Sequence, residues 1–292
     1  MSIIVTAFYK FVPLAKENLE VIQKDLMACG VSLEMGGLTI LGAEGINGTV
    51  AGSAKAIDAW KKKIEELAGE VVFKDSESDS QPFKRWFVKI RKEIVSLGKP
   101  DVLPNGKHHH IPPEEWDRMI DEEDVVILDT RNTYETDIGV FEGALDPRLQ
   151  SFQEFPEWVA NCEIPKEKNV LMYCTGGIRC EKACLEMERQ GYQNVYQLDG
   201  GILRYMKERP EGKWQGECFV FDHRVAVGKD LKPSQLYHLC PHCGDPGDVK
   251  TSCKYCGEMA RICKRCKSNP NRESCSKNCA HHLDRVLQKS AV

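Results

Sequence analysis

A cysteine, a short glycine-rich loop and an arginine form the clearest candidate for covalent chemistry in this sequence. Cys174 ends the apolar run VLMYC, which predicts a buried strand, and a helical pattern begins near Arg179. The four residues between them are Thr175, Gly176, Gly177 and Ile178. Glycines allow successive N–H groups to point inward as an anion nest, and the helix N-terminus and Arg179 add positive charge. We therefore expect Cys174 to be a nucleophilic thiolate with a lowered pKa.

Three neighbouring side chains are candidates for a supporting role, and a fourth is expected only to pack. Cys180 follows the arginine directly and either resolves a persulfide or disulfide on Cys174 or packs into the core. Cys184 continues an apolar stripe along the helix, so we expect it in the core. Asp129 and Arg131 stand at the end of the apolar run VVILD and are expected either to brace the loop or to form a salt bridge at the edge of the core.

Eight of the 14 cysteines crowd into a short C-terminal stretch. They form three CxxC pairs and one further pair, namely Cys240, Cys243, Cys253, Cys256, Cys263, Cys266, Cys275 and Cys279. Such spacing lets two thiolates reach one tetrahedral ion, so we expect two structural zinc sites with four sulfurs each. Consecutive and interleaved assignments of the pairs both fit, and His242, His281 or His282 could replace a cysteine. Redox disulfides are a weaker alternative.

Positive charge gathers in two places, although the net charge of -4 argues against a uniformly basic surface. Residues 250–289 carry ten Lys or Arg against three acidic residues, which suits either RNA docking or a metal-stapled segment that only folds. Residues 84–92 set five basic side chains beside Trp86 and Phe87. These are Lys84, Arg85, Lys89, Arg91 and Lys92. On a strand, one face would offer cations for phosphates and Phe87 for stacking on a base, although a solvated sheet face explains the spacing equally well.

The composition is that of an ordinary soluble globular protein, with 41% hydrophobic and 29% charged residues. The start, MSIIVTAFYKFVPL, lacks the basic and apolar regions of a signal peptide, and no run approaches the roughly 18 apolar residues of a membrane span. We therefore expect a cytoplasmic protein with no membrane partner, in which clustered cysteines stay reduced and bind metal or do chemistry. The oligomeric state is left open.

The first part of the chain predicts an α+β domain. Residues 1–99 show the order βαββαβ, with helical patterns at 13–29 and 54–67, which is typical of a ferredoxin-like fold. In the glycine turn between two of the strands, Glu44 and Asn47 could face a substrate, although turn chemistry alone explains Asn47.

Three further segments follow, and they place the chain as a whole in the α/β class. Residues 100–111 read as a polar, proline-rich linker, in which the histidines at 108–110 are expected in a solvated loop rather than at a metal. Residues 112–215 alternate continuous apolar runs with helical patterns, which predicts a parallel sheet buried on both faces. Residues 216–292 form the cysteine-rich zinc-binding segment.

The motifs around Cys174 resemble those of rhodanese domains. They are DTRNTYE (129–135), GVFEGA (139–144), CTGGIRCEKA (174–183) and LDGGI (198–202). The resemblance implies a domain that carries sulfur as a persulfide on the loop cysteine. Cysteine phosphatases of similar fold have five residues between cysteine and arginine, whereas four intervene here, so the comparison favours a sulfur-sized cradle over one for phosphate.

Flanking motifs extend the resemblance to the tRNA uridine hydroxylase family over about residues 1–230. They are GAEGINGTVAG (42–52), FKRWFVKIRKEIVSLG (83–98), EFPEWV (154–159) and WQGECFVFDHRVAVG (214–228). That family converts the wobble uridine of certain tRNAs to 5-hydroxyuridine with oxygen. The resemblance therefore implies tRNA as partner, molecular oxygen as co-substrate and Cys174 as a catalytic, persulfide-forming cysteine; no flavin or haem site is evident. A rhodanese-type sulfurtransferase supplied by a sulfur donor is the alternative, and a non-catalytic zinc module is a third.

Overall fold

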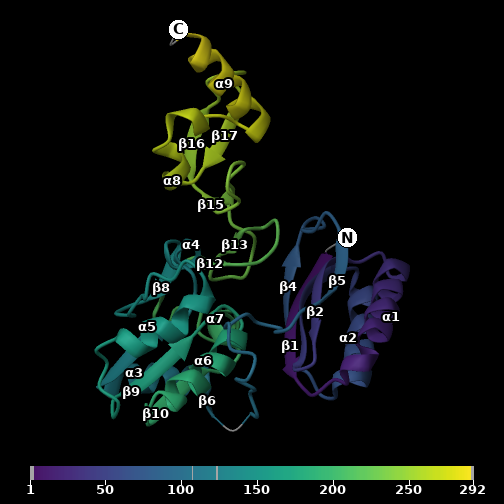
Figure 1. Cartoon of the computed structure of the whole chain (residues 1–292), viewed down its shortest axis with the longest axis vertical. Helices are drawn as coiled ribbons and strands as arrows, with labels where there is room; N and C mark the ends of the chain where they lie inside the picture. The colour runs from purple at the N-terminus through teal and green to yellow at the C-terminus, as the bar shows by residue number, and fades with distance from the viewer. Residues whose placement is uncertain (1–2, 107, 123, 291–292) are drawn as a thin grey trace.

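The computed structural model describes residues 3–106, 108–122 and 124–290, which form three regions in succession along the chain (Figure 1). The first region is a five-stranded sheet in the order β4-β1-β3-β2-β5 with two helices on one face. Its elements are β1 (Ile3–Phe11), α1 (Leu19–Ser32), β2 (Gly36–Gly42), β3 (Gly45–Gly52), α2 (Ala54–Ala68), β4 (Phe73–Ser78) and β5 (Trp86–Ile90). The order βαββαβ through β4 confirms the ferredoxin-like prediction, and β5 adds an edge strand parallel to β2.

Helix α1 begins at Leu19, later than the helical pattern from residue 13 suggested. The backbone before it is occupied in another way, because the N–H groups of Val12 and Leu14 donate to the carbonyl oxygens of Glu44 and Ala43, each at 3.0 Å. These bonds keep the chain extended along the β2–β3 turn, so a helix cannot start there.

The two faces of the first sheet have different partners. Phe8, Ile46 and Val50 point toward the helices and pack with Trp60 of α2 in one core. The opposite face is turned toward the central region (Figure 1). Side chains that alternate with the core residues, such as Tyr9, are therefore available for contact with that region.

The central region is built on a parallel sheet in the order β6-β10-β9-β7. Its elements are β6 (His109–Ile111), α3 (Pro113–Glu122), β7 (Val125–Asp129), α4 (Thr133–Thr136), β8 (Gly139–Phe141), α5 (Phe155–Asn161), β9 (Asn169–Tyr173), α6 (Ile178–Arg189), β10 (Asn194–Leu198), α7 (Gly201–Glu208) and β11 (Trp214–Gly216). Along β9, Val170 and Met172 pack into a core with α5 and α6, whereas Leu171 and Tyr173 pack into one with α3 and α7. The sheet is thus buried on both faces, as its continuous apolar strands predicted.

The expectation of a solvated loop for the three histidines is wrong in part, because His109 and His110 are exposed but lie in a strand, and His108 is buried. The last of them belong to β6, which pairs with β10, and His108 is 7% exposed. His108 and His110 each place Nε2 3.0 Å from a carboxylate oxygen of Glu181 on α6. This partner lies far away in the sequence, so the local composition gave no sign of it.

Buried charges hold the first two regions together. The Nζ of Lys182 on α6 lies 2.8 Å from a carboxylate oxygen of Glu44 and 2.7 Å from one of Glu93, and the three side chains are 0%, 4% and 9% exposed. Arg224, which follows the central region in the sequence, donates across the interface to Ser76 Oγ on β4 at 2.8 Å. Because Glu44 is engaged by Lys182, it does not stand free in the glycine turn.

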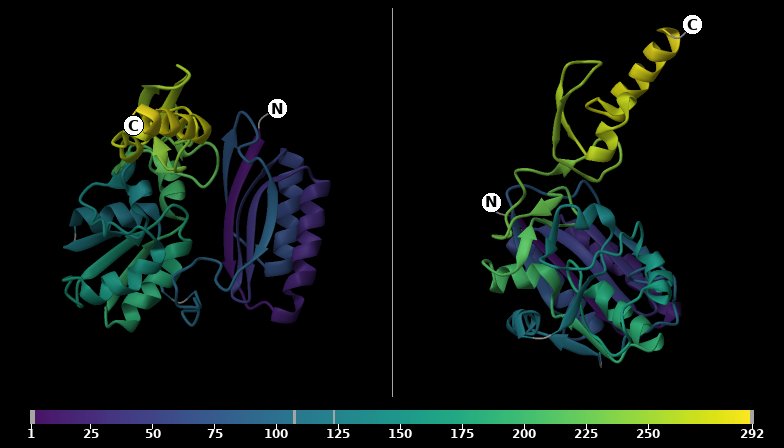
Figure 2. Two further views of the ribbon diagram at one scale, coloured as in Figure 1. Left: turned by 45° about the horizontal axis from the view of Figure 1, so that its top comes forward. Right: turned by 90° about the vertical axis from the view of Figure 1, so that its left-hand side faces the viewer.

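The C-terminal region is small and projects away from the two others (Figures 1 and 2). It follows a short β12–β13 ladder (Cys218–Phe219 and Ala226–Val227). It consists of β14 (His238–Leu239), β15 (Pro246–Gly247), β16 (Val249–Ser252), β17 (Met259–Ile262), α8 (Lys264–Lys267) and α9 (Lys277–Ser290). No helix in the described part of the chain has the length and apolarity to cross a membrane.

We predict that Lys182→Met destabilises the fold strongly. The change leaves Glu44 and Glu93 facing each other in a buried interface without their cation, and removal of one partner from a buried ion pair costs about 3–5 kcal/mol. Lys63→Met is the matched control, because Lys63 pairs with Asp25 at an exposed site where such pairs contribute about 0–1 kcal/mol. Urea unfolding measures both, and equal effects of the two changes would contradict the prediction.

Candidate functional site

Cys174 occupies the turn between β9 and α6, at the carboxyl end of a central strand. The backbone N–H of Gly177 donates to its Sγ at 3.1 Å. Gly177 has a φ of 97°, which side-chain-bearing residues rarely adopt, and its conformation turns this amide inward. The loop therefore has the anion-binding geometry that the glycines predicted.

The environment of Cys174 favours the thiolate. Burial opposes ionisation, but the Cys180 thiol, the Arg179 guanidinium and the N–H groups of residues 179 and 180 outweigh it and lower the pKa of Cys174 to about 5. Burial and the neighbouring Cys174 raise the pKa of Cys180, so Cys180 stays a neutral hydrogen-bond donor. Cys180 also lies 3.7 Å from Thr130 Oγ1, and Cys184 packs in the core as expected.

Arg179 is fixed by a buried bidentate ion pair. Its Nη1 and Nη2 lie 2.5 Å and 2.7 Å from the two carboxylate oxygens of Glu135 on α4. Burial opposes the charge of Glu135, but Arg179 prevails and holds the pKa of Glu135 below its usual range. Thr175 Oγ1 bridges the pair, at 3.3 Å from Glu135 and 3.4 Å from Arg179. The guanidinium is therefore locked beside the loop and cannot swing toward solvent.

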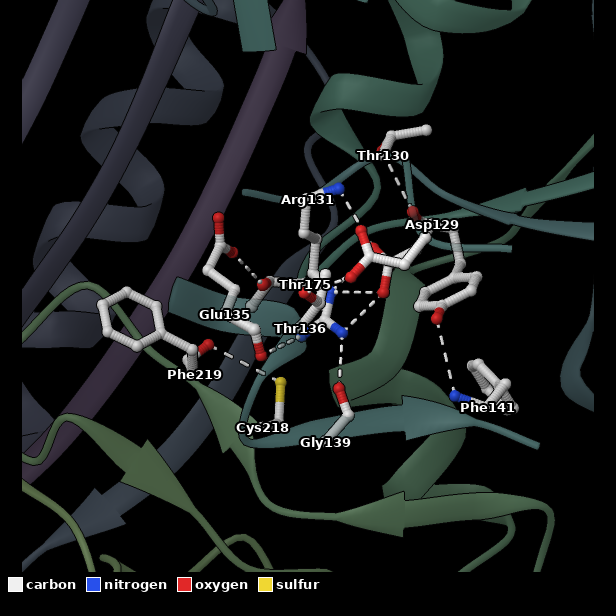
Figure 3. Close-up of polar contacts among 12 residues, drawn as sticks. Asp129, Thr130, Arg131, Glu135, Thr136, Gly139, Phe141, Thr175, Cys218 and Phe219 are labelled. Atoms are coloured by element: carbon white, nitrogen blue, oxygen red, sulfur yellow. Dashed lines mark hydrogen bonds and ion pairs between the residues drawn. The ribbon is translucent and has the colours of Figure 1, made fainter. Parts of the chain in front are cut away.

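Asp129 and Arg131 form a second, fully buried ion pair (Figure 3). Arg131 donates to both oxygens of Asp129, and its Nη2 also donates to the carbonyl oxygen of Gly139 at 2.6 Å. Its Nη1 reaches the backbone carbonyl of Glu135 at 3.3 Å. The pair is a salt bridge that also holds strand β8 and helix α4, which carries Glu135. It therefore acts on the cysteine loop indirectly, through Glu135.

The LDGGI motif and the start of α7 hold the backbone of the Cys174 loop in place. The N–H groups of Ile202 and Leu203 donate to the carbonyl oxygens of Cys174 and Thr175, at 3.0 Å and 3.1 Å. A Cβ on Gly201 would lie 2.5 Å from the Cys174 carbonyl oxygen, so this close approach of α7 to the loop requires glycine.

A cavity of about 410 Å³ lies between the loop and the open face of the first sheet. One wall is formed by side chains of the sheet, including Val5, Ala7, Tyr9, Leu38, Ile40 and Lys74. The opposite wall includes Cys174, Gly176 and Arg179, and Phe83 and Phe221 close the sides. Its size and its mixture of apolar walls with a few polar groups suit one small ring-shaped ligand above the sulfur.

Tyr9 connects the first sheet to the loop. Its hydroxyl donates to Glu181 Oε1 at 2.9 Å, and a Cβ on Gly177 would lie 2.9 Å from this hydroxyl. Glu181 also meets His108, His110 and Gln197 Nε2, the last at 3.0 Å. The carboxylate of Glu181 and the two imidazoles lie within 4.8 Å of one another. Tyr9, His108, His110 and Gln197 already occupy the carboxylate oxygens, so the group is a hydrogen-bonded brace rather than an open metal site.

The basic strand β5 continues the open face toward solvent. Phe87 and Lys89 pair with Leu38 and Ile40, which line the cavity, so all four point to the same side of the sheet. Phe87 is 39% exposed, with Lys89 Nζ 5.1 Å from its ring centre. The remaining basic residues are exposed around this edge, namely Lys84, Arg85, Arg91 and Lys92.

The C-terminal cysteines form two groups of four, each of which could hold a metal ion. One comprises Cys240, Cys243, Cys263 and Cys266, and the other comprises Cys253, Cys256, Cys275 and Cys279. Sulfur–sulfur distances are 3.5 Å for Cys243–Cys263 and 3.5 Å for Cys256–Cys275. Among the two arrangements that the spacing allowed, the structure has the interleaved one. His242 instead contacts the carbonyl oxygen of Ser274.

The sequence did not identify several residues of the site. Glu135 is the last residue of the DTRNTYE motif, and its place in that motif was the only feature of the sequence that could have identified it as a site residue. Tyr9, Lys74 and Phe221 come from other regions, and strand alternation alone shows only which face they share. Asn47, which the sequence offered as a residue that could face a substrate, lines the cavity.

Three family models match successive parts of the chain. Residues 3–94 match the UPF0176 acylphosphatase like domain, residues 112–208 the Rhodanese-like domain and residues 215–280 the Rhodanase C-terminal model. A solved rhodanese-like domain of the Alr3790 protein from Anabaena sp. is similar over 37% of this chain and 78% of its own, with 19% identity and a TM-score of 0.32.

Two curated relatives cover nearly the whole chain. The tRNA uridine(34) hydroxylase of Bdellovibrio bacteriovorus is 49% identical over 287 residues, which are 96% of this chain and 81% of that protein. The tRNA uridine(34) hydroxylase of Teredinibacter turnerae is 43% identical over 280 residues, or 94% of this chain and 86% of that protein. The chain belongs to the tRNA uridine(34) hydroxylase family.

We predict that Cys174 reacts as a thiolate well below neutral pH. The rate of alkylation by iodoacetamide, followed by peptide mass spectrometry, should rise with a midpoint near pH 5. Arg179→Met removes a positive charge, so the midpoint should move upward by about one unit or more. Cys184→Ser should leave the profile unchanged. A wild-type midpoint near the ordinary thiol value of about 8.5 would contradict the prediction.

Proposed function

We propose that the protein hydroxylates C5 of the wobble uridine of tRNA, with molecular oxygen as co-substrate and Cys174 as the catalytic cysteine. One observation carries this proposal: the loop that stabilises the Cys174 thiolate forms one wall of a cavity, and the first sheet forms the opposite wall. A uracil ring in the cavity would lie against Cys174, with aromatic and apolar side chains around it. The proposed setting is the cytoplasm.

In the proposed mechanism the base leaves its stack and enters the cavity, as enzymes acting on nucleobases require. The thiolate of Cys174 then attacks C6 of uracil, and the C5=C6 electron pair moves into the C4 carbonyl. The resulting enolate makes C5 electron-rich, so that it can react with oxygen. One oxygen atom stays on C5, and an external two-electron donor reduces the other to water. Loss of the C5 proton and departure of the Cys174 thiolate from C6 then restore the C5=C6 bond. Gly177 and Arg179 hold the sulfur in its reactive state, and Phe83 and Phe221 reduce the access of water.

The open edge of the first sheet is the proposed contact for the anticodon strand. Lys89 and the exposed basic residues of this edge can meet phosphates, and Phe87 can stack on a neighbouring base. The same face continues into the cavity through Leu38 and Ile40. A bound strand could therefore run along this edge while one base enters the cavity.

The two cysteine groups are proposed to hold one structural zinc ion each. Four convergent thiolates without an open position suit tetrahedral zinc, and the segment has too small a core to fold without it. The zinc would supply structural crosslinks only, and its module would present its basic residues to RNA.

The proposal predicts that Cys174→Ala abolishes 5-hydroxyuridine in tRNA. Cells lacking the gene would be complemented with the wild type or the variant, and tRNA nucleosides would be measured by mass spectrometry. Cys162→Ala is the matched control, because Cys162 contacts Tyr192 and is not part of the cavity. Undiminished 5-hydroxyuridine in the Cys174 variant would refute the assignment. Rapid turnover of thiosulfate and cyanide without hydroxylation would instead support a persulfide-carrying sulfurtransferase fed by a sulfur donor.

Metal analysis of the purified chain should find about two zinc ions per molecule. Cys266→Ser and Cys256→Ser each remove a ligand from a different group, so each should lower the content by about one ion. Cys29→Ser, in the first region, should leave the content unchanged. One ion or none in the wild type would contradict the two-site proposal.

A further inference from the structure

Lys74 reaches from the first sheet over the cysteine loop. It lies on β4, next to Phe73, which packs on the helix side, so Lys74 points to the open face and lines the cavity with Cys174. A Cβ on Gly176 would lie 3.9 Å from Lys74 Cδ, which places the aliphatic part of the lysine directly against the loop. The ammonium thus belongs to the wall opposite the sulfur.

Three basic side chains line the cavity, and two of them are already paired. Arg179 is bound by both oxygens of Glu135, and Arg224 lies 2.6 Å from a carboxylate oxygen of Asp222. Lys74 has neither a hydrogen-bond acceptor nor an ion-pair partner within the described residues. Its Nζ lies 4.8 Å from the ring centre of Tyr9, which is held in place by its bond to Glu181.

The Lys74 ammonium can donate a hydrogen bond to a ligand in the cavity. Burial lowers the pKa of Lys74 to about 8, although the charges of Cys174, Asp199 and Glu181 oppose the shift. The group therefore remains mainly protonated at neutral pH but lacks the solvation of a surface lysine. An unpaired, partly desolvated cation is unfavourable unless a ligand supplies the acceptor.

We propose that Lys74 is a catalytic residue that donates a hydrogen bond to a carbonyl oxygen of the uracil ring while Cys174 adds to C6. The inference rests on the proposed function and assigns a second participant to the same site. As the S–C6 bond forms, the C5=C6 π pair moves into the C4 carbonyl, whose oxygen gains negative charge. Lys74 keeps its proton and stabilises that charge, so no electron is gained or lost in this step.

We assign Arg179 a different role, because Glu135 fixes both of its terminal nitrogens and its charge acts on the sulfur. A division of labour follows, in which the central region stabilises the thiolate and the first region stabilises the adduct. The reaction would then require the two regions to be docked as they are through Lys182 and Arg224.

The test compares Lys74→Met with Lys61→Met in the full-length protein. Lys61 pairs with Asp75 on β4 but lies outside the cavity, so its change removes the same charge from a neighbouring position. Single-turnover formation of 5-hydroxyuridine at saturating tRNA should fall about 100-fold in Lys74→Met and little in Lys61→Met. The rate of covalent adduct formation with tRNA that carries 5-fluorouridine at the wobble position, measured by gel shift, should fall in parallel.

Two further measurements separate catalysis from structure. Iodoacetamide alkylation of Cys174 at a pH well above its pKa, where the thiol is ionised with or without Lys74, and urea unfolding should match the wild type in Lys74→Met, and Lys74→Arg should recover part of the rate. Undiminished hydroxylation by Lys74→Met overturns the proposal, and so does a loss accompanied by equal loss of alkylation or of stability. A wild-type protein that forms no 5-hydroxyuridine overturns the proposed function itself, and the role of Lys74 with it.

Discussion

A charged sulfur in a place almost closed to water is the condition on which this structure depends. Cys174 is 1% exposed, and a buried charge persists only where dipoles and opposite charges replace its hydration. The Gly177 amide, the neutral Cys180 thiol and Arg179 provide that replacement. Arg179 needs a partner of its own, which Glu135 supplies. The buried Arg179–Glu135 pair therefore follows from one ionised atom.

The site is also a product of two regions rather than one. A rhodanese-like domain alone would leave the cysteine loop open to solvent, whereas here the bare face of the first sheet forms the other wall. Glu181 anchors this arrangement, because it joins Tyr9 from the first region to His108 and His110 of the central one. The buried contacts of Lys182 with Glu44 and Glu93 keep the two walls at a fixed separation.

The features that sequence reasoning found are those whose parts are neighbours in the chain. The strand, the glycines and the helix around Cys174 are contiguous, so the loop could be predicted, and the ferredoxin-like order follows from successive local patterns. The histidine prediction failed because Glu181 reaches His108 only through the pairing of β6 with β10. The pairing of the cysteines and the position of Lys74 depend in the same way on contacts between distant segments, which spacing does not encode.

Because the cysteine pairs are interleaved, closure of one group affects closure of the other. The chain that closes the first group, from Cys240 to Cys266, passes through Cys253 and Cys256 of the second. Once the first group has closed, the loop that remains for the second is shorter and already constrained, so its closure loses less conformational entropy. If each group binds a metal ion, assembly in this region should accordingly be cooperative, and a single backbone cut between Cys256 and Cys263 would leave two fragments that both metal groups still hold together.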